Sequence, residues 1–150
     1  MKPRLDLEKV QPRALKPMLA LDAYIQGCGL EASLIELVKT RASQINGCAY
    51  CIHMHTREAR DAGESEERLY LLDAWRESPL YTARERAALA WTESLTLVAE
   101  SHVPDTVWEE ARNQFSEAEM VDLTLLVTTI NAWNRIAIGF RAVHPTSSAV

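Results

Sequence analysis

Residues 46–55 read NGCAYCIHMH and place two cysteines three positions apart, with two histidines directly behind them. The chain has only three cysteines, so two of them lie in this short stretch. Asn46-Gly47 is a turn signal, and the helical pattern that follows it continues to Gly63. We therefore expect a helical hairpin whose second helix, over about residues 48–62, begins at the cysteine pair.

Helical signals recur along the rest of the chain, whereas strand signals are poor. No run of β-branched residues alternates with polar ones between turn residues, and glycine and proline number only 5 and 6. Thr82 with Glu85, and Ser116 with Glu119, have the form of capping boxes at helix starts. We expect an all-α fold of about six to seven helices, over approximately residues 13–26, 31–45, 48–62, 66–76, 82–100, a segment opening at Pro104, and 117–140.

Length and charge limit the class of protein. A chain of 150 residues suits one domain over residues 1–150. The formal net charge is −5 with scattered Lys and Arg, which argues against a nucleic-acid or membrane surface. The N-terminal stretch lacks the apolar run of a secretory signal, and no run approaches the ~20 apolar residues of a membrane span. We expect a cytoplasmic protein, and structural disulfides are rare in the cytoplasm.

Helix geometry groups the chemically capable side chains of this region. At about 100° per residue, Cys48, Cys51 and His55 share one helix face, whereas His53 points elsewhere. If the preceding helix packs antiparallel to this one, Glu36 lies ~16 Å and His55 ~13 Å from the turn, so the two are nearly level. Glu36 could then orient or charge His55.

A cysteine pair at a helix N-terminus suits thiol chemistry, because the helix dipole and the free N–H groups favour a thiolate. A second cysteine three residues away can capture an oxidised sulfur as a disulfide. Two other interpretations stay open. One is a zinc site formed by Cys48, Cys51 and His55, with Cys28 as a possible fourth ligand. The other is inert packing, which is what we expect of Cys28 between its two glycines.

The wider spacing E-x11-C-x2-C-x3-H, formed by Glu36, Cys48, Cys51 and His55, resembles the signature of the alkylhydroperoxidase D-like proteins in the carboxymuconolactone decarboxylase superfamily. The segments RASQINGCAYC, MHTREARDAGE, YTARERAALAWTE and NAWNRIAIGFR look like the same family, so the resemblance covers about residues 15–142. It implies an all-helical fold and a homo-oligomer, commonly a trimer or hexamer. We expect no cofactor and no metal.

The resemblance also implies a thiol-dependent peroxidase. By position, Cys51 would be the peroxidatic cysteine, Cys48 its disulfide partner, and Glu36 with His55 the proton relay. The helix dipole alone would instead make Cys48, nearer the terminus, the more acidic thiol. The best-known peroxidases of the family carry a histidine just before the second cysteine, where this chain has Tyr50, a poor base near neutral pH.

The predicted reaction is therefore reduction of a hydroperoxide at Cys51, formation of the Cys48–Cys51 disulfide, and its reduction by a lipoyl or thioredoxin-like dithiol partner. The alternatives are a non-enzymatic thiol–disulfide redox sensor or binding module, a zinc-stabilised module, and a carboxymuconolactone decarboxylase-type enzyme. The last is disfavoured because the lactone decarboxylases of the superfamily do not depend on this cysteine pair.

Overall fold

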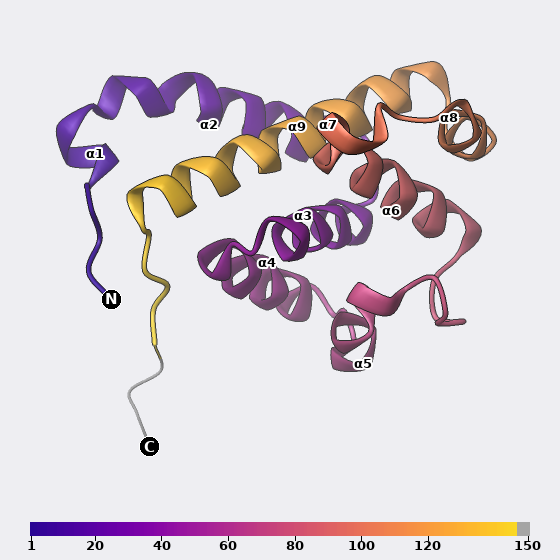
Figure 1. The fold of residues 1–150 in the computed structure, drawn as a ribbon, viewed down its shortest axis with the longest axis horizontal. Helices are drawn as coiled ribbons and strands as arrows, with labels where there is room; N and C mark the ends of the chain where they lie inside the picture. Colours follow the sequence, from indigo (N-terminus) through magenta and orange to yellow (C-terminus); the bar gives the residue numbers. More distant parts are fainter. Residues whose placement is uncertain (147–150) are drawn as a thin grey trace.

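The structure is a computed structural model that describes residues 1–146, and none of these residues forms a strand. The predicted all-α class is confirmed. The described residues form nine α-helices rather than six or seven, because the short α1 was not predicted and the helix expected over 82–100 divides into α6 and α7. In chain order the elements are α1 Leu7–Val10, α2 Pro12–Gly27, α3 Ala32–Asn46, α4 Ala49–Asp61, α5 Glu66–Tyr70, the 3-10 helix η1 Leu72–Ala74, α6 Ala83–Thr96, α7 Val98–Ser101, α8 Asp105–Arg112 and α9 Glu117–Phe140 (Figure 1).

Both predicted capping boxes are present. At the start of α6, the Thr82 hydroxyl accepts a hydrogen bond from the Glu85 N–H, and the Glu85 carboxylate accepts one from the Thr82 N–H. Ser116 and Glu119 exchange the same pair of bonds at the start of α9. These bonds satisfy N–H groups that a helix leaves free in its first turn, so the two boundaries follow from local sequence.

Two predicted helices are interrupted, the first beside a hydrogen bond from a hydroxyl to a carbonyl and the second at Leu71, ahead of three carbonyls that Arg86 bonds. The helix expected over 82–100 breaks after Thr96, where the Ser101 hydroxyl donates to the Ser94 carbonyl at 2.7 Å. The helix expected over 66–76 divides into α5 and η1. There the Arg86 guanidinium donates to the carbonyls of Trp75, Arg76 and Ser78.

The helix α3 lies at the centre of the fold and packs against α4, α6 and α9. Its residues Leu37, Val38 and Ala42 are fully buried. The long helix α9 also supplies core residues, as its apolar sequence predicts: Met120, Leu123, Leu126, Val127 and Ile130. The α3–α4 hairpin is thereby held on one side by α9, and this arrangement positions the cysteines.

The helix α2 runs alongside α9, and the short α1 packs against α2 (Figure 1). The short α1 was not expected from the charged, proline-rich sequence; the Asp6 carboxylate caps it by accepting the Lys9 N–H at 3.2 Å. Two side-chain bonds attach α2 to α9. Tyr24 Oη donates to Asp122 at 2.7 Å, and Trp133 Nε1 donates to Asp22 at 2.7 Å.

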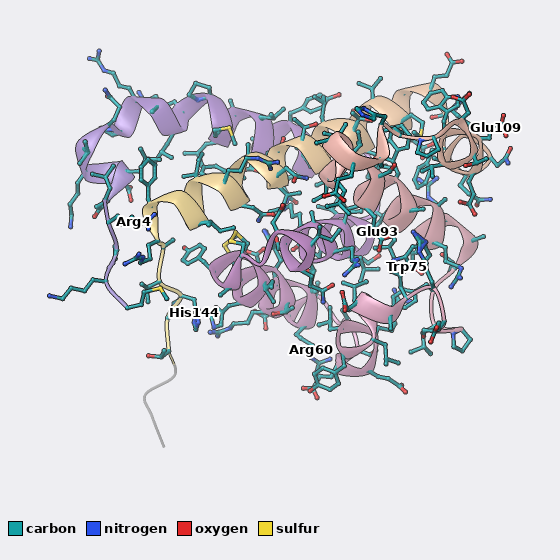
Figure 2. The ribbon with its side chains drawn as sticks, viewed as in Figure 1. Arg4, Arg60, Trp75, Glu93, Glu109 and His144 are labelled. Atoms are coloured by element: carbon teal, nitrogen blue, oxygen red, sulfur yellow. A yellow bond between two sulfur atoms is a disulfide. The ribbon has the colours of Figure 1, made fainter. Side chains whose placement is uncertain are left out.

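The opposite end of the molecule is held by ionic side chains. Trp75 Nε1 donates to the Glu93 carboxylate at 2.8 Å, and Arg41 and Arg76 pair with the same carboxylate (Figure 2).

Within residues 1–146, no helix is both long enough and apolar enough to cross a membrane.

Candidate thiol redox site

The turn between α3 and α4 has the geometry that Asn46-Gly47 predicts. Gly47 adopts a left-handed conformation, with φ of +67°, which a residue without a side chain reaches at no steric cost. The Cys48 N–H then bonds the Ser43 carbonyl at 3.0 Å and closes the end of α3. The two helices therefore form the expected antiparallel hairpin, with Cys48 at the first position after the turn.

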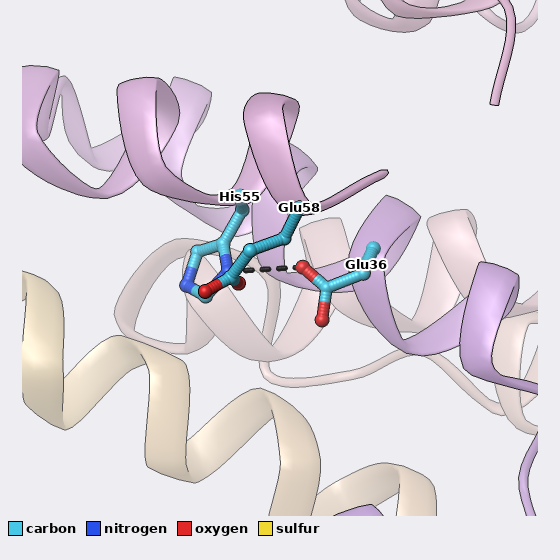
Figure 3. Close-up of side chains that lie close together, drawn as sticks. All are labelled: Glu36, His55 and Glu58. Carbon is cyan, nitrogen blue, oxygen red and sulfur yellow. Dashed lines mark hydrogen bonds and ion pairs between the residues drawn. The ribbon is translucent and has the colours of Figure 1, made fainter. Parts of the chain in front are cut away.

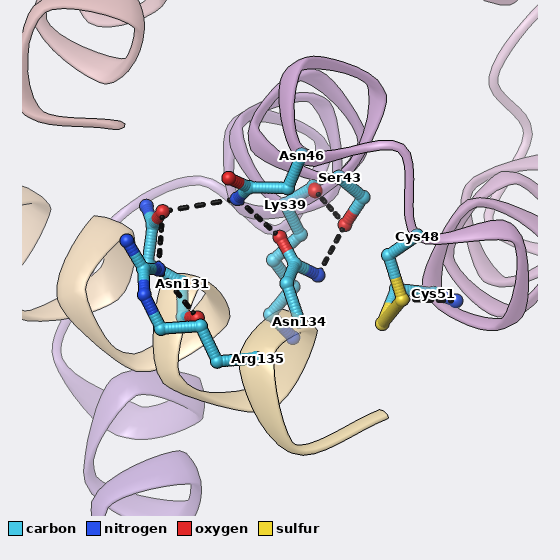
Figure 4. Close-up of a disulfide and its surroundings, with 8 residues drawn as sticks. All are labelled: Lys39, Ser43, Asn46, Cys48, Cys51, Asn131, Asn134 and Arg135. Carbon is cyan, nitrogen blue, oxygen red and sulfur yellow. Dashed lines mark hydrogen bonds between the residues drawn. A yellow bond between two sulfur atoms is a disulfide. The ribbon is translucent and has the colours of Figure 1, made fainter. Parts of the chain in front are cut away.

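Cys48 and Cys51 form a disulfide at the start of α4, with their Cα atoms 5.4 Å apart (Figure 4). Cys48 is the N-cap residue of α4, and its sulfur accepts the Cys51 N–H at 3.4 Å. Each cysteine is 2% exposed. In the reduced protein both sulfurs would lie at the positive end of the α4 dipole, where a thiolate is stabilised.

His55 lies one turn after Cys51 and contacts two carboxylates (Figure 3). Its Nδ1 is 3.0 Å from Glu36 Oε2 and 2.9 Å from Glu58 Oε2. The expected contact between Glu36 and His55 is thus present. Glu58 was not singled out in the sequence, although its position three residues after His55 puts it on the same face of α4.

This contact determines the protonation of the ring. An ionised carboxylate only accepts hydrogen bonds, so Nδ1 must carry a hydrogen when it faces two of them. In the neutral imidazole, Nε2 is then unprotonated and can accept a proton. His55 is 4% exposed, so this basic nitrogen is available only to groups inside the site.

Glu36 is a buried carboxylate held in its charged form. Burial raises the pKa of Glu36, but the hydrogen bond from His55 and the charge of Lys39 together bring it below its ordinary value of 4.5. Lys39 Nζ lies 3.3 Å from Glu36 Oε1, and their side chains are 9% and 12% exposed. Glu36 is therefore ionised at neutral pH and can orient His55.

A cavity of about 920 Å³ opens beside these residues. Cys51, His55, Glu36 and Glu58 all line it, whereas Cys48 does not. Its size is that of a small-molecule site. The helix α9 contributes a mainly apolar wall, formed by Leu126, Thr129, Ile130, Trp133, Ile136 and Ala137. Of the two cysteines, a molecule inside this cavity therefore contacts Cys51 and not Cys48.

Buried amides hold the turn against α9 (Figure 4). Asn46 Nδ2 donates to the side-chain oxygens Oδ1 of Asn131 at 3.0 Å and Asn134 at 2.8 Å. Asn134 Nδ2 in turn donates to the Ser43 hydroxyl at 3.0 Å. Sequence reasoning missed this network, because nothing in the local pattern of α9 indicates which residues reach the turn.

The remaining candidates lie apart from the cluster. The His53 ring stacks on His144, with ring centroids 4.8 Å apart, as expected for a histidine on another face of α4. Tyr50 lines the cavity beside Cys51. Cys28 packs against a different apolar cluster from Cys48 and Cys51, in agreement with the packing role expected of it.

The zinc arrangement considered above is not assembled. Among the residues that the structure describes, one group of possible metal ligands has its ligand atoms within 4.8 Å of one another: Glu36, His55 and Glu58. The three-residue set lacks both cysteines. A cation there would also face the Lys39 ammonium, which already pairs with Glu36.

Comparison with known proteins gives this site a family context. The model of the Carboxymuconolactone decarboxylase family matches residues 12–94, which include the whole hairpin. The uncharacterized protein YdfG of Bacillus subtilis is 41% identical over 138 residues, which cover 92% of this chain and 94% of YdfG.

Two solved structures show how far the fold extends. A protein of unknown function from Agrobacterium tumefaciens, named as a candidate AhpD antioxidant defence protein, is 47% identical with a TM-score of 0.95, covering 97% of this chain and 100% of its own. The debrominase Bmp8 shares 17% identity with a TM-score of 0.78, covering 90% of this chain and 73% of Bmp8. The second likeness shows the fold alone, so the reaction has to be argued from the site.

Proposed function

The chain belongs to the carboxymuconolactone decarboxylase family and has an AhpD-like fold, and on that premise we propose that it is a thiol-dependent peroxidase. The observation that carries the proposal is the arrangement on α4. Cys51 lines a cavity together with His55, whose Nδ1 is held by carboxylates so that Nε2 is free to accept a proton. The sulfur partner, Cys48, lies within bonding distance of Cys51.

The first step oxidises Cys51. His55 takes the thiol proton, and the thiolate attacks the terminal oxygen of a hydroperoxide. A sulfur–oxygen bond forms as the oxygen–oxygen bond breaks, and the proton from His55 goes to the departing alkoxide. The products are an alcohol and a sulfenic acid on Cys51.

The second step uses Cys48. Its sulfur attacks the Cys51 sulfenic acid, the disulfide forms, and hydroxide leaves with a proton as water. A dithiol reductant, such as a lipoyl or thioredoxin-like partner, then returns both cysteines to thiols and is itself oxidised to a disulfide. Two electrons thus pass from the dithiol to the hydroperoxide, and the cycle needs no metal or prosthetic group.

Cys51 rather than Cys48 is the attacking residue in this proposal. The helix dipole favours Cys48, the N-cap residue. Access and the base favour Cys51, because it lines the cavity and precedes His55 by one turn. A nucleophile has to meet its substrate, so we give access the greater weight. Tyr50 then need not act as a base, since His55 supplies that role.

A homo-oligomer, a trimer or hexamer, is also part of the proposal. Its support is apolar surface on the helices beside the cavity: Leu19 and Tyr24 on α2 are 55% and 52% exposed, and Ile138 on α9 is 47% exposed. We take these exposed apolar side chains, on two helices that pack together, as support for a contact surface. Light scattering on the purified protein measures the assembly directly.

The test is steady-state consumption of hydrogen peroxide and cumene hydroperoxide with a dithiol reductant. We expect turnover in the wild type and in Cys28→Ser, no turnover in Cys51→Ser, and strongly slowed turnover in Cys48→Ser. Full turnover by Cys51→Ser would contradict the proposal. A wild type that forms its disulfide without catalytic turnover would instead favour the redox-sensor alternative.

A further inference from the structure

We propose that the cavity at Cys51 selects by charge: it admits neutral organic molecules and rejects those that carry a carboxylate near the reacting group. The substrate class, a neutral organic hydroperoxide, rests on the proposed peroxidase function. The charge selectivity itself depends only on the groups that line the cavity, so it can be tested separately.

Carboxylates come from each of the first four helices that wall the cavity. They are Glu8 of α1, Asp22 of α2, Glu36 of α3 and Glu58 of α4. Lys39 is the one Lys or Arg among the described residues that line it. With His55 neutral, four carboxylates and one ammonium leave a formal charge of −3 on the lining. When His55 takes the Cys51 proton, the thiolate and the imidazolium cancel, so the formal charge of the lining stays at −3.

The charge of the Lys39 ammonium is already paired with Glu36. Its Nζ lies 3.3 Å from Glu36 Oε1, and the side chains of this pair are only 9% and 12% exposed. A carboxylate entering the cavity would share this cation with Glu36, and two like charges would then lie side by side in a buried site. Glu36 is held in place there, because it also accepts a hydrogen bond from His55 Nδ1 at 3.0 Å.

Two other carboxylates are fixed in the wall by hydrogen bonds. Asp22 accepts the Trp133 indole N–H at 2.7 Å, which holds its charge on the cavity side of α2. Glu58 accepts from His55 Nδ1 at 2.9 Å, with half of its side chain exposed. An anion that approaches His55 or the indole therefore meets a like charge next to it.

The rest of the cavity wall favours uncharged, apolar groups. The apolar side chains of α9, together with Leu15 and Leu19 of α2, can cover a hydrocarbon group and remove it from water. A carboxylate placed there would lose its hydration without gaining a hydrogen-bond partner. The same reasoning separates this chain from the decarboxylation that gives the family its name, since a decarboxylase must bind the carboxylate it removes.

Alkylation of Cys51 tests the charge selectivity without any hydroperoxide. The two reagents are iodoacetamide, which is neutral, and iodoacetate, which is an anion with the same leaving group. The protein is the reduced double variant Cys28→Ser, Cys48→Ser, which retains Cys51 alone. We expect its preference for iodoacetamide to exceed that of glutathione by about tenfold, and to shrink as salt is added.

Matched variants assign the effect to the wall. Asp22→Asn removes a charge but keeps an oxygen that can accept the Trp133 N–H, so the preference for the neutral reagent should fall several-fold. Glu109→Gln removes an exposed carboxylate on α8, away from the cavity, and should leave the preference unchanged (Figure 2). A Cys51 preference equal to that of glutathione, or an equal response in the two variants, would overturn the proposal.

A pair of hydroperoxides tests the substrate class. Cumene hydroperoxide with a carboxylate in the para position and the methyl ester of that acid differ mainly in charge. We expect kcat/KM to favour the ester by about tenfold in the wild type, and by less in Asp22→Asn. Equal values would overturn the proposal. If neither compound is turned over while Cys51 still prefers iodoacetamide, the charge selectivity stands and the peroxidase function fails.

Discussion

Glu36 in the α3–α4 hairpin and Glu85 at the start of α6 are helix carboxylates with equally buried side chains, 12% and 15% exposed. Burial raises the pKa of each, and the partners of each outweigh that effect, so both pKa values lie below 4.5. The two carboxylates therefore look alike in burial and charge. They differ in what faces them.

Glu85 faces Arg68, at 2.5 Å, and the backbone of its own helix cap. Arg68 also pairs with Glu64 at 2.9 Å. A guanidinium keeps its charge throughout the working pH range, so this cluster holds α5 against α6 and exchanges no proton. We call Arg68, Glu85 and Glu64 the Arg68 cluster.

Glu36 faces His55, whose Nε2 can accept a proton, and both line a cavity with Cys51. A buried charge with a lowered pKa therefore does not by itself identify a reactive site. A partner that can accept a proton, together with a cavity and a nucleophile, separates the hairpin from the Arg68 cluster.

The largest expected effect is that of the base. His55→Gln keeps a polar side chain but removes the nitrogen that accepts the Cys51 proton. We expect the rate of Cys51 oxidation by hydroperoxide to fall by about 10²- to 10³-fold at neutral pH. Stopped-flow kinetics on the reduced protein measure it. An unchanged rate would mean that the hairpin, like the Arg68 cluster, is structural.

The complementary change is Glu85→Gln in the Arg68 cluster. It should lower the free energy of unfolding by about 2 kcal/mol, because the part-buried Arg68 loses a charged partner, whereas a glutamine keeps an oxygen that can accept the Thr82 N–H. Urea unfolding measures this, with the exposed Glu77→Gln as the matched control. The rate of Cys51 oxidation should not change. A rate that falls with Glu85→Gln would break the contrast between the two regions.

Local sequence was sufficient for one part of the fold and of the site. Thr82 with Glu85 and Ser116 with Glu119 specify helix starts, because a capping box is complete within four residues. Antiparallel packing about Asn46-Gly47 brought Glu36 level with His55, because helix rise and a two-residue turn leave little freedom.

Other features depend on contacts that the pattern of a single helix does not show. The helix expected over 82–100 breaks beside the Ser101–Ser94 hydrogen bond, and the carbonyls that follow η1 bond Arg86 of α6. Asp22 meets Trp133 across 111 positions. Helical periodicity describes one helix at a time, so it cannot show which side chains of α2 and α9 complete a cavity built around α4. Glu58 is the exception, since its spacing from His55 was visible in the sequence.

The two carboxylates on His55 should differ in importance. Glu36→Gln removes the buried charge that orients the ring, and we expect the rate of Cys51 oxidation to fall about tenfold. Glu58→Gln should have a smaller effect, because Glu58 is half exposed and Glu36 remains in place. The same stopped-flow assay compares them. A larger loss from Glu58→Gln than from Glu36→Gln would reverse the assignment.

The smallest expected effect is a pH dependence at the start of α9. The Ser116 N–H and Arg84 lower the pKa of Glu119 to about 2. Because the pKa is lowered on folding, Glu119 stabilises the protein above pH 4.5, and this contribution is lost as the pH falls toward about 2. Solvent screening of a side chain that is 35% exposed limits it to about 0.5 kcal/mol.

Urea unfolding at pH 6 and pH 2 tests this effect. Glu119→Gln should be less stable than the wild type at pH 6 and nearly equal to it at pH 2. The control is Glu117→Gln in the same first turn, whose side chain is 90% exposed. A difference between Glu119→Gln and the wild type that persists unchanged at pH 2 would show that the charge of Glu119 is not its cause.

The most direct test of the central claim, that Cys51 attacks the hydroperoxide, is to trap the first product. Reduced Cys48→Ser protein is treated with one equivalent of cumene hydroperoxide and then with dimedone, and the labelled peptide is identified by mass spectrometry. The account predicts a dimedone adduct on Cys51 and none on Cys28. Consumption of the hydroperoxide without an adduct on Cys51, or equally fast labelling of Cys48 in the Cys51→Ser protein, would contradict it.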